Sequence, residues 1–441
     1  MKDEKKKISA PIDDFLKSYA AKSPVRCHMP GGKGKNDPFD ITEIDGADSL
    51  FESCGIIAES EENAARLFGA GKTLFSCGGS TLSVQTMLAL AKAESPEKHR
   101  VIAGRYCHKS LISACVLLDL EVDWIMPAEY LSCKISKEEV EAKINEDTLC
   151  VFAQSIDYYG GECDIRAVSE ACRAKNIPLL VDNAHGAYLV FTDRHPLKSG
   201  ADMTADSAHK TLPCLTGCGY LHIGKDSRFT AFSERAKELM ALFGSSSPSY
   251  LMLQSLDLCN RFIGEESRCA FDALEKIKEL KTALSQLGFG LYESDPIRIT
   301  VDCFSAGYGG FELNKLLEEQ NIFCEYFDGR YVVLLFSVSQ DLGDLHKILR
   351  AFEKIPIKEK ICAAKIAPRL PKAVVSPKKA VFSPSALVDT ENAKGRICGE
   401  IRCSCPPCVP LIMPGELFDD GIINAVREYG ADKVRILLQS P

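Results

Sequence analysis

Strand and helix patterns alternate along the chain from about residue 60 to Asp182, and this alternation limits the possible folds more than any other feature. Apolar runs typical of buried strands are followed by segments with helical spacing, one of which begins with a capping box at Ser136 and Glu139. Strands that alternate with helices in this way form βαβ units and a mostly parallel sheet. We therefore expect an α/β fold. The expected strands are 73–77, 100–103, 121–126, 148–155 and 177–182, and the expected helices include 60–68, 81–93, 108–118 and 164–175.

The second half of the chain has a different rhythm. A long helical stretch, 227–287, has breaks near Gly244 and Gly264, and residues 297–354 mix short strands and helices as in a small α+β domain. Residues 356–385 are rich in proline and lysine without a period, which is typical of a linker. The expected division is an N-terminal arm (1–24), a large domain (25–290), a small α+β domain (291–355), a linker (356–385) and a C-terminal module (386–441).

Composition narrows the classes of function. Of 441 residues, 46% are hydrophobic and 26% charged, as in an ordinary soluble enzyme. The formal net charge of -8 argues against a nucleic-acid partner. The first residues lack the apolar core of a signal peptide, and no apolar run approaches the roughly 20 residues that span a bilayer. We expect a cytoplasmic protein with no membrane partner.

The chain holds 20 cysteines, most of them single residues inside apolar segments, where a reduced thiol packs as a small hydrophobe. The exception is a cluster of four near the C-terminus. It could hold a metal ion, form a redox pair or simply pack; packing is favoured, and no metal ligand is expected. The cluster consists of Cys398, Cys403, Cys405 and Cys408.

An aspartate and a lysine mark the site that the sequence predicts. Asp182 closes the apolar run 177–182, and Lys210 follows in a polar turn that begins at Ser207. In enzymes that use pyridoxal 5'-phosphate (PLP), a lysine amine forms a Schiff base with the cofactor, and a carboxylate keeps the pyridine nitrogen protonated so that the ring accepts electrons. Alone, Lys210 could be a solvated lysine and Asp182 a turn cap. Together they predict a PLP enzyme that acts on amino acids.

Three further polar turns suit the same cofactor. The run Gly79-Ser80-Thr81 stands between a strand and a helix, where glycine lets the backbone approach a phosphate and hydroxyls donate to it. His108 follows a strand, and its flat ring could stack on a pyridine. Ser207 and His209, beside Lys210, could reach the phosphate. Each turn alone is more typical of ordinary turn or surface chemistry. All of them follow expected parallel strands, however, at the edge where open α/β sheets bind ligands.

In these motifs the chain resembles the Orn/Lys/Arg decarboxylase family of fold type I PLP enzymes, in its short bacterial branch. The resemblance covers nearly the whole chain and keeps the family order. The matching segments are His28-Met29-Pro30-Gly31, Asp40-Ile41-Thr42-Glu43, Gly79-Ser80-Thr81, His108-Lys109-Ser110, Asp182 to Gly186, Ser207 to Pro213, Ser247 to Tyr250, Pro406-Pro407 and Pro414-Gly415-Glu416.

This resemblance implies an aspartate aminotransferase-like large domain, a small α+β domain and a C-terminal decarboxylase-type module. It implies that Lys210 is the Schiff-base lysine and Asp182 the pyridinium partner. His108 would stack on the ring, and His185 would support the ring face or its oxygen. The residues that would hold the phosphate are Gly79, Ser80, Thr81, Ser207 and His209.

The implied reaction is α-decarboxylation of a basic L-amino acid (arginine, lysine or ornithine) to an amine and CO2, as in polyamine biosynthesis. Glu43 or Asp48 would bind the distal cation of this substrate. A homodimer or a larger even homo-oligomer is implied, in which residues 247–250 could serve the neighbouring cofactor. Two alternatives stay open: an aminotransferase or lyase, with Arg298 as a possible ligand for the substrate carboxylate, or a PLP-binding paralogue without turnover.

The chain departs from the family pattern at several positions. Gly32 stands where the family usually has a histidine, Gly78 where it tends to have an asparagine, and Asn183 where a glutamate is common. Ile156-Asp157 replaces a usual Pro-Thr pair, and Cys405 and Cys408 replace a tyrosine and a glycine. Because the Schiff-base residues are all present, these departures bear on substrate identity and turnover rather than on cofactor binding.

Overall fold

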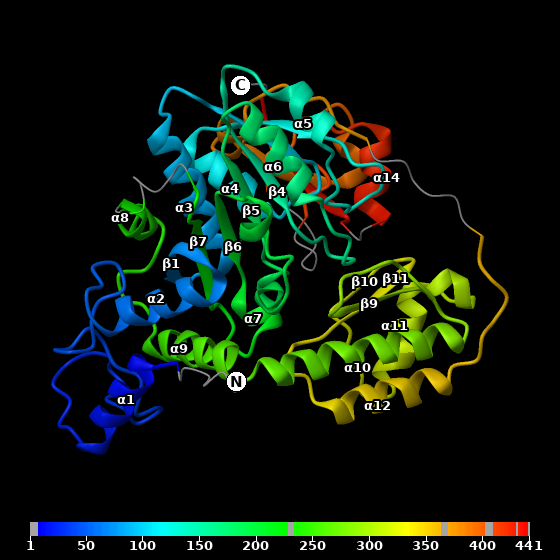
Figure 1. Ribbon diagram of the computed structural model, residues 1–441. Helices are drawn as coiled ribbons and strands as arrows, with labels where there is room; N and C mark the ends of the chain where they lie inside the picture. Colours follow the sequence, from blue (N-terminus) through cyan, green and yellow to red (C-terminus); the bar gives the residue numbers. More distant parts are fainter. Residues whose placement is uncertain are drawn as a thin grey trace. The chain divides into compact units, whose positions relative to one another are not determined.

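The structure is a computed structural model. It describes residues 8–227, 233, 235–362, 369–401, 409–428 and 431–439. The chain divides into two compact units, whose helices and strands carry their labels in Figure 1. The first comprises residues 1–96, 165–272 and 337–339, and the second comprises 97–164, 273–336 and 340–441. The five-part division expected from the sequence stays a prediction.

Three strands of the first unit run in the same direction. Strand β7 (Gly219–Gly224) is antiparallel to both β1 (Ala70–Ser76) and β6 (Met203–Asp206), and β6 is parallel to β5 (Leu179–Asp182). Strands β5, β6 and β7 are buried along their whole length, as expected for strands covered on both faces. The C-terminal ends of β1, β5 and β6 therefore lie at one edge.

Helices surround these strands in the first unit. Helix α3 is buried along most of its length, and it packs on β6 and β7. The helices are α1 (Pro11–Ala21), α2 (Ile56–Phe68), α3 (Gly79–Glu94), α6 (Ile165–Ala174), α7 (Ala208–Thr211), α8 (Ala236–Ala241) and α9 (Tyr250–Glu265). Helix α10 (Ser267–Gln286) begins in this unit and ends in the second.

The second unit contains three groups of strands. Strand β2 (Arg100–Gly104) is parallel to β3 (Glu121–Ile125) and to β4 (Thr148–Gln154). An antiparallel sheet has the order β10-β11-β9-β8, and β12 pairs with β13. These strands are β8 (Gly290–Leu291), β9 (Arg298–Asp302), β10 (Tyr326–Phe327), β11 (Tyr331–Leu335), β12 (Ser385–Asp389) and β13 (Lys433–Leu437). The helices are α4 (Lys109–Leu118), α5 (Lys137–Lys143), α11 (Gly310–Glu318), α12 (Leu342–Glu353), α13 (Pro377–Val381) and α14 (Asp420–Glu428).

The central sheet has the strand order β1-β7-β6-β5-β4-β2-β3. Because only β7 is antiparallel among the strand pairs described, the expected mostly parallel α/β sheet is confirmed. The capping box of α5 is also confirmed, since the Ser136 side chain accepts from the Glu139 N–H and the Glu139 carboxylate accepts from the Ser136 N–H. The sequence missed five strands of the structure, which are β6, β7, β8, β12 and β13. Part of the expected linker is ordered, because α13 has Ala380 fully buried.

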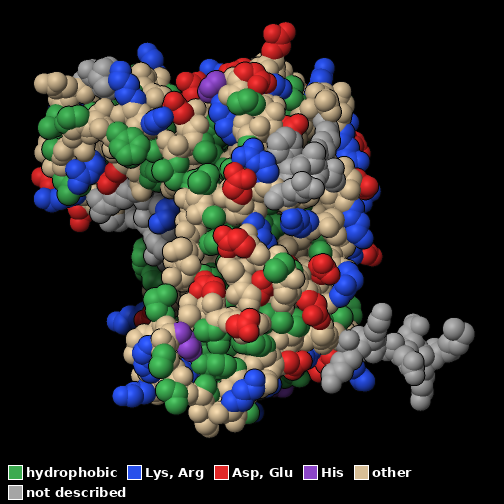
Figure 2. Space-filling model, turned by 90° about the vertical axis from the view of Figure 1, so that its left-hand side faces the viewer, with side chains coloured by type: hydrophobic (Ala, Val, Ile, Leu, Met, Phe, Trp, Pro, Cys, Tyr) green, Lys and Arg blue, Asp and Glu red, His purple; other side chains and the backbone are tan. Residues whose placement is uncertain are grey.

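Three further features of the described residues bear on membrane, nucleic-acid and metal binding: helix hydropathy, surface charge and the cysteines. Among these residues, no helix combines the length and the hydropathy needed to cross a bilayer. On the face in Figure 2, basic and acidic side chains are interspersed rather than gathered in a stripe of one sign. The described cysteines form no disulfide. Cys398 is buried, and the other three cysteines of its cluster lie outside the described residues.

Candidate active site

The C-terminal ends of β1, β5 and β6 bring most of the predicted site residues to one edge of the sheet. The Gly79 turn follows β1, Asp182 ends β5, and Ser207 follows β6. All predicted site residues except His108 belong to the first unit, so their geometry can be described together. The lysine lies on α7, which begins directly after Ser207.

The turn before α3 is built to receive an anion. Gly79 has a φ of 63°, in the left-handed region that favours glycine, and its N–H donates to the Gly217 carbonyl at 2.7 Å. The Ser207 hydroxyl donates to the Ser80 oxygen at 2.8 Å, which leaves the Ser80 hydrogen for another acceptor. Thr81 is exposed in the first turn of the same helix. Hydroxyls and free N–H groups at a helix N-terminus are the donors that a phosphate requires.

His209 lies beside this turn, since a Cβ on Gly79 would stand 3.8 Å from the His209 Cε1. The His209 Nδ1 is 2.9 Å from the Cys218 carbonyl, which can only accept, so Nδ1 carries the hydrogen. Burial lowers the pKa of His209, and the charge of Lys210 acts in the same direction. In the neutral ring, Nε2 is therefore an acceptor. A phosphate contact at Nε2 requires the imidazolium or a protonated phosphate oxygen.

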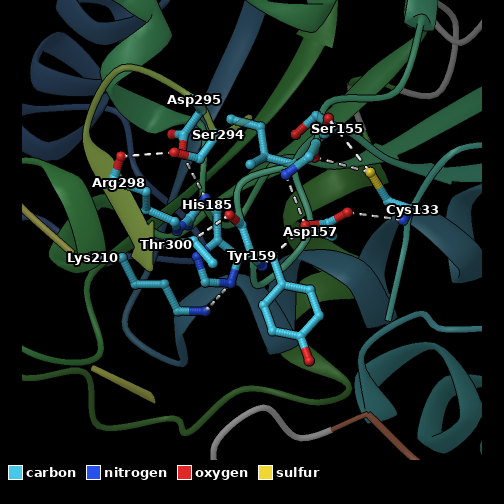
Figure 3. Close-up of polar contacts among 12 residues, drawn as sticks. Cys133, Ser155, Asp157, Tyr159, His185, Lys210, Ser294, Asp295, Arg298 and Thr300 are labelled. Atoms are coloured by element: carbon cyan, nitrogen blue, oxygen red, sulfur yellow. Dashed lines mark hydrogen bonds and ion pairs between the residues drawn. The ribbon is translucent and has the colours of Figure 1, made fainter. Parts of the chain in front are cut away.

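Lys210 and His185 face each other across the edge (Figure 3). The Lys210 Nζ is 3.3 Å from the His185 Nε2. His185 is 5% exposed, whereas Lys210 is half-buried. An amine and an imidazole at this distance can share a proton, which suits acid–base chemistry beside a reacting carbon.

Asp182 supplies a carboxylate to the same cluster. It is 3% exposed, and its Oδ1 accepts from the Ala184 N–H at 3.0 Å. Burial raises the pKa of Asp182, while the Ala184 N–H and the charge of Lys210 act against this rise. A carboxylate removed from water in this way interacts strongly with a nearby cationic nitrogen.

These residues fit the cofactor that the sequence predicts. The donor set at the start of α3 suits a phosphate, the Lys210 amine suits an aldehyde, and the buried Asp182 carboxylate suits a pyridinium nitrogen. The backbone also allows a close approach at this point. A Cβ on Gly219 would lie 3.0 Å from the Gly79 carbonyl carbon and 3.2 Å from the Ser80 nitrogen. The individual roles of these residues stay predictions.

His108 belongs to the second unit, where it caps α4. Its Nδ1 accepts from the Ser110 N–H at 3.2 Å. The preceding turn is fixed by a buried ion pair, in which the Arg105 Nη2 lies 2.8 Å from the Glu416 Oε2. Glu416 ends the Pro414-Gly415-Glu416 segment, so this part of the C-terminal module anchors the turn that carries His108.

Two polar residues of the second unit have structural partners (Figure 3). Arg298 is 1% exposed, and its Nη1 lies 3.1 Å from the Asp295 Oδ1. Asp157, one of the departures from the family pattern, accepts from the N–H groups of Cys133, Tyr159 and Gly161 at 2.8 to 3.2 Å. Burial raises the pKa of Asp157 to about 6. Asp157 therefore holds its loop together.

Sequence reasoning missed a second polar cluster in the first unit. Asp206 Oδ2 accepts from the Asn183 amide at 2.8 Å and lies 3.0 Å from the His195 Nε2. The Leu197 N–H points at the His195 Nδ1, so Nε2 carries the hydrogen and donates to Asp206. His222 completes the cluster. The side-chain nitrogen or oxygen atoms of His195, Asp206 and His222 that could bind a metal ion lie within 4.8 Å of one another. The available signal was a histidine and an aspartate inside apolar strands.

Comparisons with known proteins agree with the resemblance seen in the sequence. The family model described as "Orn/Lys/Arg decarboxylase, major domain" matches residues 11–303. An arginine decarboxylase of Bacillus subtilis is 26% identical over 94% of this chain and 92% of its own length. An arginine decarboxylase of Halalkalibacterium halodurans is 27% identical over 95% of this chain and 93% of its own length. The structure of the Escherichia coli constitutive lysine decarboxylase aligns with a TM-score of 0.77 and 17% identity, over 97% of this chain and 82% of the other. The expected family resemblance and fold type are confirmed.

Proposed function

The chain belongs to the Orn/Lys/Arg decarboxylase family, and we propose that it removes the α-carboxylate of a basic L-amino acid, with arginine as the first substrate to test. It is a PLP-dependent amino-acid decarboxylase, as its family and fold establish. The choice of arginine is supported by the arginine decarboxylases among its relatives, which match this chain over nearly their whole length.

The observation that carries the proposal is the grouping of Lys210, His185 and the buried Asp182 at one sheet edge. When bound, PLP supplies an electron-accepting ring for the electron pair of the breaking bond. The Asp182 carboxylate holds a proton on the ring nitrogen, where it stabilises the developing charge. Ser80, Ser207 and the start of α3 anchor the phosphate.

The proton balance of the reaction assigns the remaining groups. As CO2 leaves, the bond from Cα to the carboxylate breaks and a bond from Cα to hydrogen forms. The Lys210 amine and the His185 imidazole, 3.3 Å apart, hold the proton that this new bond requires. Because His185 is buried, it delivers that proton without exchange with bulk water.

The distal cation of the substrate needs an acidic partner. Of the two acidic residues suggested by the sequence, Asp48 is already engaged. Its carboxylate accepts from the N–H groups of residues 49, 54, 55 and 57, just before and at the start of α2. Burial raises the pKa of Asp48, but these N–H groups outweigh burial and lower the pKa overall. Glu43 is exposed, and its carboxylate accepts from the neighbouring Thr42 hydroxyl. Glu43 is therefore the better candidate.

The test is a product screen with PLP and arginine, lysine or ornithine as substrates. We expect agmatine from arginine, with an equal amount of CO2, in larger yield than cadaverine from lysine or putrescine from ornithine. Amine and CO2 are measured separately by mass spectrometry. Bound PLP without any amine product, on any amino acid, would contradict the proposal.

The same screen tests an aminotransferase, which would release a keto acid and no CO2. Such an enzyme needs an arginine that can reach the substrate carboxylate. Arg298 does not provide one here, because it is buried and paired with Asp295. An even homo-oligomer, a cytoplasmic location and a role in polyamine biosynthesis stay predictions.

A further inference from the structure

Two cysteines close the turn between α7 and β7. Cys214 and Cys218 are separated by three residues, and the turn is tightened by the Cys218 N–H, which donates to the Leu215 carbonyl at 3.1 Å. Both thiols rest on α9. The Cys214 Sγ is 3.7 Å from the Ser255 carbonyl, and the Cys218 Sγ is 3.4 Å from the Met252 carbonyl, one helical turn away.

The two thiols are neighbours, because they donate to carbonyls that lie one helical turn apart on α9. The neighbouring Cys214 side chain lowers the pKa of Cys218 most, and the Ser255 hydroxyl adds to this effect against that of burial. The neighbouring Cys218 and Cys259 side chains, together with burial, raise the pKa of Cys214. Cys214 is partly exposed, whereas Cys218 is buried. The turn therefore holds two neighbouring thiols, of which Cys218 ionises more readily than Cys214.

The same turn supports the candidate phosphate site. The Gly217 carbonyl accepts from the Gly79 N–H at 2.7 Å, and the Cys218 carbonyl accepts from both the backbone N–H and the Nδ1–H of His209. Gly217 has a φ of 90°, and a Cβ there would lie 2.8 Å from the Met252 Cε. The turn is thus held tightly between α9 and the start of α3, so a change in its shape reaches both.

We propose that Cys214 and Cys218 form an oxidisable dithiol whose disulfide loosens the cofactor phosphate turn. A peroxide is the oxidant. The thiolate of one cysteine attacks hydrogen peroxide, which gives a sulfenic acid and one water; the other thiol then attacks that sulfur, which gives the disulfide and a second water. Two thiols and one peroxide are consumed, and a dithiol reductant reverses the change.

The expected consequence follows from the contacts of the turn. The new sulfur–sulfur bond draws both sulfur atoms away from the α9 carbonyls and moves the peptide units of Gly217 and Cys218. Gly79 and His209 then lose their acceptors. This inference rests on the proposed location of the phosphate, but formation of the disulfide does not.

The sequence provides a direct assay for the disulfide. Trypsin cleaves after Lys210 and Lys225, and the peptide 211–225 carries Cys214 and Cys218 but no other cysteine. After peroxide treatment of the PLP-loaded enzyme, followed by alkylation, we expect this peptide without alkyl groups and two hydrogens lighter. Two alkylated thiols in this peptide, or a link to the peptide that contains Cys259, would overturn the pairing.

Cofactor retention tests the coupling. After desalting, we expect PLP to dissociate roughly tenfold faster from the oxidised enzyme, the effect of losing one or two hydrogen bonds, and dithiothreitol to restore retention. Far-UV circular dichroism establishes that the oxidised protein is folded. Cys214→Ala should retain PLP with or without peroxide. Cys54→Ala, which removes an exposed thiol of the same unit, should respond like the parent enzyme. A disulfide that forms without faster PLP loss would overturn the coupling.

Discussion

The first unit holds two polar clusters built on the same strands, and they differ in what they can do. Asp182 ends β5 and faces the Lys210 cluster, while the next residue, Asn183, belongs to the Asp206 cluster. On β6, Asp206 ends the strand and Ser207 begins the turn that holds the lysine. One cluster includes a half-buried amine, whereas every member of the other is buried.

The two aspartates show the physical difference. Burial raises the pKa of Asp182, and the Ala184 N–H and the charge of Lys210 offset only part of this rise. Burial acts on Asp206 as well, but the two histidines and the Asn183 amide outweigh it and lower its pKa. A buried carboxylate with a raised pKa can respond to a cationic ligand, while one held by imidazole and amide partners stabilises the fold.

Loss of the lysine should have the largest effect. In Lys210→Ala we expect turnover to fall by at least about 1,000-fold, since both the covalent anchor and a proton carrier are removed. Bound PLP should also lose its visible absorbance, the absorbance that borohydride abolishes in the parent enzyme. Lys225→Ala, an exposed lysine after β7, is the matched control. A yellow, borohydride-sensitive Lys210→Ala enzyme would refute the assignment.

Replacement by asparagine should affect turnover at one aspartate and the free energy of unfolding at the other. In Asp182→Asn we expect PLP to be retained and turnover to fall at least about 100-fold, because the charge that holds the ring proton is gone. In Asp206→Asn we expect turnover to change little and the free energy of unfolding to fall by about 1–3 kcal/mol. Steady-state CO2 release and urea unfolding measure the two quantities. Equal loss of turnover in both variants would contradict the assignment of Asp182 to catalysis and of Asp206 to stability.

Asn183 tests how the second cluster accommodates a departure from the family pattern. In Asn183→Glu, a second carboxylate would replace the amide that donates to Asp206 at 2.8 Å, and we expect a loss of about 3 kcal/mol of unfolding free energy. Combining it with Asp206→Asn restores one amide and one carboxylate. Urea unfolding of the double variant should recover at least half of the loss, and strict additivity would contradict the pairing.

The remaining expected effect is a change in the pH dependence of the free energy of unfolding. Burial lowers the pKa of His222 to about 3, from an ordinary value of 6.5. Between these values the unfolded chain binds a proton that the folded chain does not, so this group makes stability fall as pH is lowered from 6.5 toward 3, by up to about 1.4 kcal/mol per pH unit. His222→Gln should lack this part of the slope in urea unfolding. His346→Gln, at an exposed position on α12, should keep it.

Much of the fold could be predicted from periodicity, because each βα unit carries its own local signal. The helix starting near Ser136, the strand that ends at Asp182 and the helix after Gly79 all follow from spacing and caps. Strand β7 was missed, since its glycines and histidine do not form an apolar run. The strand after residue 430 was missed because it gains its stability by pairing with β12, which is distant in the sequence.

The sequence by itself predicted the chemistry of the site, because a lysine, an aspartate and a Gly-Ser-Thr turn at the ends of parallel strands are a combination that few other sites require. Only the tertiary structure decided which side chains contact each of the two aspartates, Asp182 and Asp206. Asp182 and Asp206 are indistinguishable as letters at the ends of apolar strands, yet one faces an amine and the other an amide and an imidazole. Their different behaviour depends on contacts with residues far along the chain, which periodicity does not encode.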